Sequence, residues 1–564
     1  MTKEQAQYDI IIIGAGASGG LPAAAYLQKA GAKVLMIDAN HEAGTHVKAH
    51  EYFAGATCVP CAGGFVGSTN PYWEDLELER YGAELIINKR SAGLIFPDDT
   101  SLFIGPADPE GTIQSLARYS QKDAETMMGW LTRVGEVFVE VNELLYFSPP
   151  TPERLDLIYE KLAYVAGIDV EDFRQMNGWE FLDAIFEDHR IKQFLMVTCT
   201  VSWVFSDMDA RGEGPMGMVG ALFLGLGQLK GSNHMVVHAL LRVFTEYGGT
   251  LWKNTKVDEI VVEDGKAVGV RLSDDAVMHP GETIRAKYGV ISNAGAKPTY
   301  DMLDENVLKQ ADPALAQKMK HWDMATRPST VTVWVLKEPP KFKAAATDDY
   351  VDQADWIFKG MDSVDSWKDW SVAQRSGDLE GAFGDSGGWW EIFMPALIDP
   401  TQRSPEGPLT LRIEEVLPYH LRDENGKADV ERWETEKWKL VDRREDILET
   451  MAPGFKDLIL DRVATSPVDL ARSNLTAVKG CAQGGAFAGD QNYLGRMPYR
   501  MPIDNLYMCN SVWPASLTFA GTGYNVASIV AEEMGIRDQD WWVGRPGQWF
   551  LENMPRLLPE RLRT

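Results

Sequence analysis

Residues 8–38 read YDIIIIGAGASGGLPAAAYLQKAGAKVLMID and decide the fold of this chain. An apolar run from Ile10 to Ile13 enters a glycine-rich turn, an alanine-rich stretch follows, and a second apolar run from Val34 to Ile37 ends in an acid. A strand, a glycine turn, a helix, a second strand and an acid, in this order, are typical of a dinucleotide-binding unit. The segment therefore predicts a strand–helix–strand unit with a nucleotide at the turn.

Each special position of this unit has a physical task. Gly14 permits the tight turn, Gly16 lets the backbone approach a pyrophosphate, and Gly19 lets the helix pack closely on the strand. The diphosphate then lies against free N–H groups at the helix N-terminus, and Asp38 accepts hydrogen bonds from a ribose. Pro22 falls inside the expected helix, where it lacks an N–H, and predicts a local kink.

The composition excludes several classes of protein. A chain of 564 residues with 45% hydrophobic and 24% charged residues suggests two or more globular domains. The formal net charge of −27 repels polyanions, so we expect no nucleic-acid partner. Five cysteines form no disulfide framework. The first residues lack an apolar leader, and no apolar run reaches the ~18 residues of a membrane span, which predicts a cytoplasmic protein.

Later segments continue the same nucleotide-binding sheet. We expect a helix at 232–247, strands joined by an Asp264-Gly265 turn at 248–268, strands at 288–293 and 505–510, and a helix at 524–534. The predicted fold class is thus α/β, with a discontinuous Rossmann-like domain of residues 1–75, 231–300 and 496–564. An inserted α+β substrate domain takes residues 76–230 and 301–495. Its polar, weakly periodic stretch 341–385 predicts a surface insertion or lid.

Five motifs in this order resemble a known group, the phytoene desaturase, carotenoid isomerase and retinol saturase branch of the FAD-dependent amine oxidase-like superfamily. The likeness covers nearly the whole chain. Its carriers are GAGASGG (14–20), GGTLWKNTKVDEIVVEDGKAVGVRL (248–272), VISNAGAKPTYDML (290–303), DPTQRSPEGPLTL (399–411) and NLYMCNSVWPASLTFAGTGYNVAS (505–528).

The resemblance implies non-covalent FAD, bound in an extended form. The ribose acid is then Asp38, the adenine meets the backbone of Val257, and the segment around Asn510 lies along the isoalloxazine. The full expected cofactor-binding set is Gly14, Gly16, Ala17, Ser18, Gly19, Asp38, Ala39, Val257, Asn293, Ala294, Asn510, Gly521, Thr522 and Tyr524. The chain departs from the family pattern at two places. It has Gly44-Thr45-His46 where the family commonly has Gly-Gly-Arg, and its terminal motif lacks the family's proline and glycine run. Both places lie where the substrate should meet the flavin, so the resemblance does not identify the substrate.

The implied function is an FAD-dependent dehydrogenase or desaturase that takes hydride from a C–H bond of a largely apolar small molecule. His46 and Tyr524 are the candidate catalytic residues, and the electron acceptor is oxygen, a quinone or an electron carrier. The enzymatic alternatives are an oxidase, a saturase and a redox-neutral isomerase. A non-enzymatic alternative is a prenyl- or lipid-binding protein like the Rab escort proteins, which lack an intact glycine fingerprint.

Other groups have a structural and a functional interpretation. Cys58 and Cys61 form CVPC, either a redox dithiol or a loop pair without redox role, and Cys509 is either a flavin attachment point or a small buried residue. His234 and His238 share a helix face but lack a third ligand for a metal. The apolar runs 194–205 and 216–229 are core, or else line a substrate channel or make peripheral membrane contact.

Overall fold

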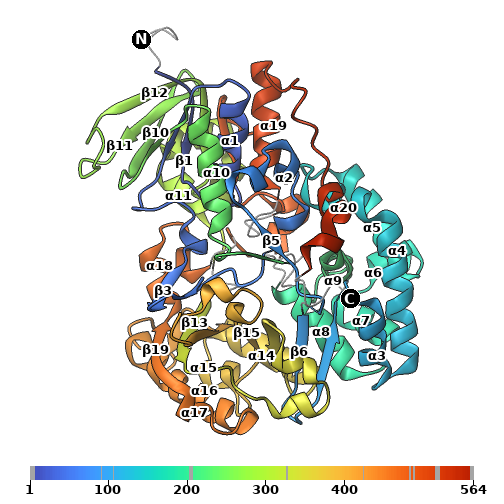
Figure 1. Ribbon diagram of the computed structural model, residues 1–564. Coiled ribbons are helices and arrows are strands. Elements are labelled where there is room, and N and C mark those ends of the chain that lie inside the picture. Colours follow the sequence, from blue (N-terminus) through green and yellow to red (C-terminus); the bar gives the residue numbers. More distant parts are fainter. Residues whose placement is uncertain are drawn as a thin grey trace.

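The computed structural model describes residues 7–65, 67–90, 92–105, 107–201, 208–225, 227–324, 328–423, 425–481, 484–486, 489–514 and 521–558. Two seven-stranded sheets form its framework. In Figure 1 the first sheet lies at the upper left with α1 (Gly20–Lys29) and α10 (Met235–Glu246), the second lies below it, and the long helices α4 (Gln121–Tyr146) and α5 (Pro152–Ala166) lie to the right.

The first sheet is built around the opening segment of the chain. Its order is β10-β11-β12-β1-β2-β9, and β20 pairs with β12. The strands are β1 (Tyr8–Ile13), β2 (Val34–Ile37), β9 (Thr250–Trp252), β10 (Val257–Glu263), β11 (Lys266–Leu272), β12 (Thr283–Ser292) and β20 (Leu506–Met508). The β1–β2, β1–β12, β2–β9 and β12–β20 pairs are parallel. The predicted α/β class, and the assembly of one sheet from four distant segments, are confirmed.

Helix α1 covers this sheet and packs against α10 and against α19 (Thr522–Met534). Its first eight residues are all buried, because small side chains let it approach the strands closely. Pro22 is the third residue of α1, in the first turn, where a backbone N–H has no helical partner in any case. The expected kink is therefore absent from α1, and the proline costs the helix no hydrogen bond.

The second sheet has the order β19-β13-β16-β15-β14-β6-β7. Strands β13 (Ser329–Leu336) and β16 (Leu409–Val416) pair antiparallel over eight residues, and every residue of both is buried. The other strands are β6 (Ala92–Ile95), β7 (Ser101–Ile104), β14 (Trp356–Lys359), β15 (Trp390–Phe393) and β19 (Ile459–Thr465). The sheet thus joins strands from two sequence regions that lie on either side of residues 231–300.

The remaining elements connect and cover these sheets. The helices are α2 (Tyr72–Asp75), α3 (Pro109–Ala117), α6 (Val170–Gln175), α7 (Gly178–Ile185), α8 (His189–Val201), α9 (Glu213–Gly220), α11 (Ala296–Asp301), α12 (Glu305–Ala311), α13 (Pro313–Lys320), α14 (Val364–Ser376), α15 (Leu379–Phe383), α16 (Trp433–Met451), α17 (Phe455–Leu458), α18 (Pro467–Ser473) and α20 (Gln548–Leu557). Short strands are β3 (His50–Phe53), β4 (Ala56–Cys58), β5 (Leu85–Ile86), β8 (Gln228–Leu229), β17 (Leu421–Arg422) and β18 (Ala428–Asp429).

Within the stretch 341–385, expected as a surface insertion or lid, residues 356–359 form a strand of the second sheet, whereas much of α14 is exposed. This strand, β14, pairs with β15 on one side and with β6 on the other, and all four of its residues are buried. A strand with neighbours on both sides has its backbone hydrogen bonds satisfied within the sheet. Over its four residues β14 shows no alternation of apolar and polar side chains, because it is buried on both faces.

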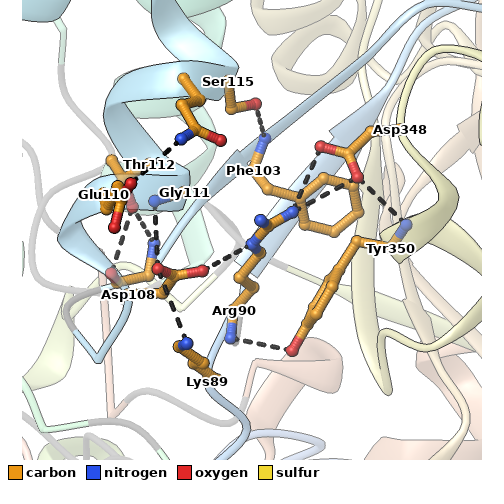
Figure 2. A network of polar contacts seen from close by, with 12 residues as sticks. Lys89, Arg90, Phe103, Asp108, Glu110, Gly111, Thr112, Ser115, Asp348 and Tyr350 are labelled. Atoms are coloured by element: carbon orange, nitrogen blue, oxygen red, sulfur yellow. Dashed lines mark hydrogen bonds and ion pairs between the residues drawn. The ribbon is translucent and has the colours of Figure 1, made fainter. Parts of the chain in front are cut away.

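A polar network fastens the start of this stretch to the N-cap of α3. Arg90 donates through Nε to Asp108 at 2.8 Å and through Nη1 to Asp348 at 3.3 Å, and its backbone N–H donates to the hydroxyl of Tyr350 at 3.1 Å (Figure 2). Arg118 donates to the other oxygen of Asp348 at 2.5 Å. The carboxylate of Asp348 is thus shared by two guanidinium groups. These charge-assisted hydrogen bonds hold residues 348–350 against the N-cap of α3.

The two apolar runs of the sequence, 194–205 and 216–229, are buried wherever the structure describes the side chains named below. Helix α9, which opens the run 216–229, is buried from its second residue to its last, so this part of the run is core. Residues 194–197 of the other run are also buried, whereas residues 202–205 lie outside the described part of the chain. In the residues that are described, no helix combines the length and hydropathy that crossing a bilayer requires.

A buried charge cluster joins the two halves of the molecule and generates a prediction. Arg412 is fully buried, pairs with Glu391 and with Glu414 at 3.3 Å, and donates to the carbonyl of Pro60 at 3.0 Å. Arg412→Met should lower the free energy of unfolding by about 3–5 kcal/mol, because it leaves two buried carboxylates without their cation. Urea unfolding followed by circular dichroism measures this loss.

The matched control is Arg472→Met, since the Arg472 side chain is 55% exposed and pairs at 2.8 Å with Glu434, which is 51% exposed. This variant should lose no more than about 1 kcal/mol. Equal losses in the two variants would show that burial does not set the strength of the Arg412 cluster.

Candidate dinucleotide site

A cavity of about 530 Å³ opens at the carboxyl ends of the parallel strands β1, β2 and β12. This edge of a parallel sheet is where such folds bind their ligands. Of the residues expected from the sequence, the cavity is lined by Gly14, Gly16, Ala17, Ser18, Asp38, Ala39, His46, Val257, Asn293, Ala294 and Asn510. Gly19, Gly521, Thr522 and Tyr524 do not line it.

The glycine turn closes around the side chain of Asn293. Gly14 has φ +91°, a conformation that favours glycine. A Cβ at Gly16 or at Gly19 would collide with the Asn293 side-chain amide, and a Cβ at Gly20 would collide with the carbonyl of Gly14. The close approach of helix to turn, which the sequence assigns to Gly19, thus also depends on Gly20, and Gly16 makes room for an asparagine as well as for a ligand.

Asp38 is fixed at the end of β2 by the turn itself. Its Oδ2 accepts from the N–H of Ala15 and its Oδ1 from the N–H of Asn40, each at 2.7 Å. The residue is 5% exposed, and this burial raises the pKa of Asp38 despite the two backbone donors. Two of its lone pairs are occupied, and further acceptor capacity faces the cavity, as recognition of a ribose hydroxyl requires.

His46 lies on the loop after β2, between the cavity and the segment around Asn474. The side-chain amide of Asn474 lies 2.6 Å from Nε2 of His46 and donates to it, which places the ring proton on Nδ1. Burial lowers the pKa of His46 to about 4. The imidazole is therefore neutral at physiological pH, and its orientation is set by a residue 428 positions away.

The N-terminus of α19 is anchored on the glycine turn rather than exposed in the cavity. Thr522 donates through Oγ1 to the carbonyl of Ser18 at 2.9 Å, and Gly523 donates to the same carbonyl through its N–H at 3.0 Å. Tyr524 points away: its ring packs edge-on against Tyr26, with 5.5 Å between centroids, and its hydroxyl lies 3.5 Å from Arg537. Tyr524 therefore does not meet His46, although the sequence pairs them as catalytic candidates.

The cysteines of the sequence motifs are free and buried. Burial raises the pKa of the Cys58 thiol to about 11, and it also raises the pKa of Cys61, which lines the cavity. Both are protonated at neutral pH, whereas a redox dithiol reacts as a thiolate. Cys509 does not line the cavity, and its Sγ lies 3.4 Å from Oδ1 of Asn293. These positions favour the structural interpretation of each cysteine.

Several lining residues were not among the cofactor-binding residues expected from the sequence. Lys256 and Lys297 bring positive charge to the wall, and each pairs with an acid close to it in sequence, Asp258 and Asp301 respectively. Asn474 and Thr476 arrive from a segment that follows α18. For Lys256, its place directly before the strand that begins at Val257 is a local signal. The others come together through long-range packing, which spacing along the chain does not encode.

Comparison with known proteins agrees with this geometry. The family described as an NAD(P)-binding Rossmann-like domain matches residues 12–76. Over 556 residues the chain is 24% identical to one of the subunits of limonene dehydrogenase from Castellaniella defragrans, and the match covers 96% of this chain and 97% of that protein. It is 23% identical over 565 residues to prolycopene isomerase 1 of an Oncidium hybrid cultivar, covering 95% and 85% of the two chains.

The fold is also that of solved amine oxidases. A putrescine oxidase variant superimposes with a TM-score of 0.56 at 13% identity, over 94% of this chain and 99% of that one. The predicted relationship is confirmed, since relatives along the full length and the architecture agree. Along nearly its whole length the chain is similar to oxidoreductases and isomerases such as limonene dehydrogenase and prolycopene isomerase, and it has the fold of the amine oxidases.

Proposed function

We propose that this protein binds FAD non-covalently and uses it to oxidise a C–H bond of a largely apolar small molecule. The observation that carries the proposal is the cavity at the strand ends, where the glycine turn, Asp38 and Asn293 converge. The donors of the turn and the first turn of α1 suit a diphosphate. The buried acceptor Asp38 suits a ribose.

The residues present fit a flavin dinucleotide along the length of the cavity. Val257 lies in the wall at the start of β10, where a backbone can meet an adenine, and Lys256 beside it adds positive charge. Ala294 and Asn510 follow β12 and β20, on the carboxyl side of the sheet. Cys509 is directed at Asn293 instead of the cavity, which supports non-covalent binding.

The apolar substrate class rests on two kinds of support. Two relatives that match along nearly the whole chain are named for limonene and prolycopene, which are hydrocarbons. In this chain the cavity wall includes Leu475, Val478 and Met302 beside its polar groups. FAD, when bound, supplies the acceptor for hydride. The protein orients the substrate and keeps water out, and we propose that His46 takes up the proton at Nε2, directly or through water, once the Asn474 amide has turned away from this nitrogen.

The first test concerns the cofactor. Purified protein should be yellow, and precipitation with acid should release all flavin to the supernatant. Gly16→Ala should weaken FAD binding at least tenfold, because the added Cβ collides with the Asn293 amide. The matched control is Gly135→Ala, since a Cβ at Gly135 in α4 meets nothing within 4 Å. Equilibrium dialysis of apoprotein with FAD measures both affinities.

Colourless wild-type protein that takes up no added FAD would contradict the proposal that this protein binds FAD. Flavin that stays with the acid precipitate would contradict non-covalent binding alone, and leave the oxidoreductase assignment intact.

The second test concerns His46. Anaerobic reduction of the bound flavin by a panel of cyclic and acyclic isoprenoids should slow at least a hundredfold in His46→Gln, the scale of general base catalysis. In wild type the reductive rate should be constant from about pH 8 down to about 5 and fall as pH drops through the His46 pKa of about 4, because protonated imidazole accepts no proton. His50→Gln is the matched control, since His50 begins the next strand, β3, and is exposed.

An unchanged rate in His46→Gln would remove this residue from the mechanism. A panel member that is isomerised without net flavin reduction would favour the redox-neutral isomerase, which the similarity to prolycopene isomerase supports as a second candidate. Reoxidation of reduced enzyme by oxygen or by a quinone then separates oxidase from dehydrogenase.

A further inference from the structure

The loop after β2 and the first turn of α10 bring three metal-ligating side chains together. Nε2 of His234 lies 2.9 Å from Oε1 of Glu42. The ring of His238 stands edge-on to that of His234, with 4.6 Å between the centroids. One ligand atom from each of the three side chains lies within 4.8 Å of the other two. The structure thus supplies the third ligand that the sequence did not reveal.

Burial gives this cluster a fixed base and an open face. His234 is 5% exposed, whereas the Glu42 side chain is 40% exposed and His238 is half-buried. On the other side of its ring, Nδ1 of His234 is buried without a hydrogen-bond partner among the described residues, whereas Nε2 is directed at Glu42.

The chemistry of the donor set selects a class of ion. Two histidines four residues apart share one face of a helix, the spacing that holds zinc in helical His-x-x-x-His sites. Two imidazoles and one carboxylate suit borderline divalent ions, while Mg²⁺ and Ca²⁺ prefer oxygen ligands alone. In a tetrahedral site with bonds of ~2.0–2.1 Å, neighbouring ligand atoms lie about 3.3 Å apart. Rotation of the two partly exposed side chains reaches this spacing.

We propose that Glu42, His234 and His238 bind a divalent transition-metal ion of the Zn²⁺ class, with water in the fourth position. His41 is nearby, since its Nε2 lies 4.0 Å from Oε2 of Glu42, but its side chain is 72% exposed. Fixing so exposed a side chain costs conformational entropy. Because of this cost, we assign the fourth position to water and not to His41.

The proposed ion lies beside the cavity and not in it. None of its three ligands lines the cavity, whereas Gly44, His46 and Val47 of the same loop do. Gly44, with φ +73°, approaches α10 so closely that a Cβ would collide with Val237. The ion therefore fastens one wall of the dinucleotide cavity to α10. This structural role is independent of which substrate or flavin the cavity holds.

The test is calorimetric titration of chelator-treated, flavin-containing protein with ZnCl₂ at neutral pH. Wild type should bind one Zn²⁺ per chain, and His238→Ala and Glu42→Gln should each weaken binding at least a hundredfold. His279→Ala is the matched control, since His279 also pairs with an acid, Glu282 at 3.2 Å, but both are exposed. Its affinity should equal that of wild type. Circular dichroism without metal verifies that each variant is folded.

Two further readouts separate this site from adventitious binding. X-ray absorption of the zinc complex should show nitrogen and oxygen ligands and no sulfur, which distinguishes it from the Cys58 and Cys61 pair. Hydrogen exchange of residues 39–47 should slow on addition of Zn²⁺ in wild type and not in His238→Ala. The proposal is overturned if wild type shows no saturable binding, if sulfur ligates the ion, or if both variants bind as tightly as wild type.

Discussion

The contact between the Asn293 side chain and the glycine turn is the constraint on which the rest of the first sheet depends. Gly16 and Gly19 approach its amide so closely that neither tolerates a Cβ. Asn293 extends β12, and its backbone carbonyl accepts from the side chain of Asn510 at 3.1 Å. Three segments that are hundreds of residues apart therefore meet at one side chain, and the cavity is the space they leave.

The local sequence pattern was sufficient to predict those elements whose structure depends on residues close together in the chain. The glycine turn, the Asp264-Gly265 hairpin and helix α10 each have a short-range cause, a positive φ, a tight turn or a 3.6-residue apolar repeat, and each was predictable. Strand β14 could not be predicted in this way, because a strand that is covered on both faces and both edges shows no alternation of apolar and polar residues. Its place is decided by partners at residues 93–95 and 390–393.

The candidate site shows the same division. Gly14, Asp38 and Ala39 follow from the opening segment, and they line the cavity. Asn474 reaches His46 only through tertiary packing, and Glu42 meets His234 across 192 positions. Tyr524 was expected at the cofactor because it lies close in sequence to the N-terminus of α19 near the glycine turn. Its side chain instead lies on the face of α19 that packs against Tyr26. Sequence motifs locate segments, and packing decides which side chains face the ligand.

The interleaved order of strands in the first sheet has a consequence for how the chain is made. β1 leaves the ribosome first, but it pairs with β12, and β12 in turn awaits β20 at residues 506–508. At typical elongation rates, roughly 25–100 s separate the synthesis of β1 from that of β20. Until β12 is made, β1 has β2 on one side only, and its free edge is prone to pair with other chains. The sheet of the dinucleotide site is therefore complete only after β20 has been made, shortly before α19, the helix that docks on the glycine turn.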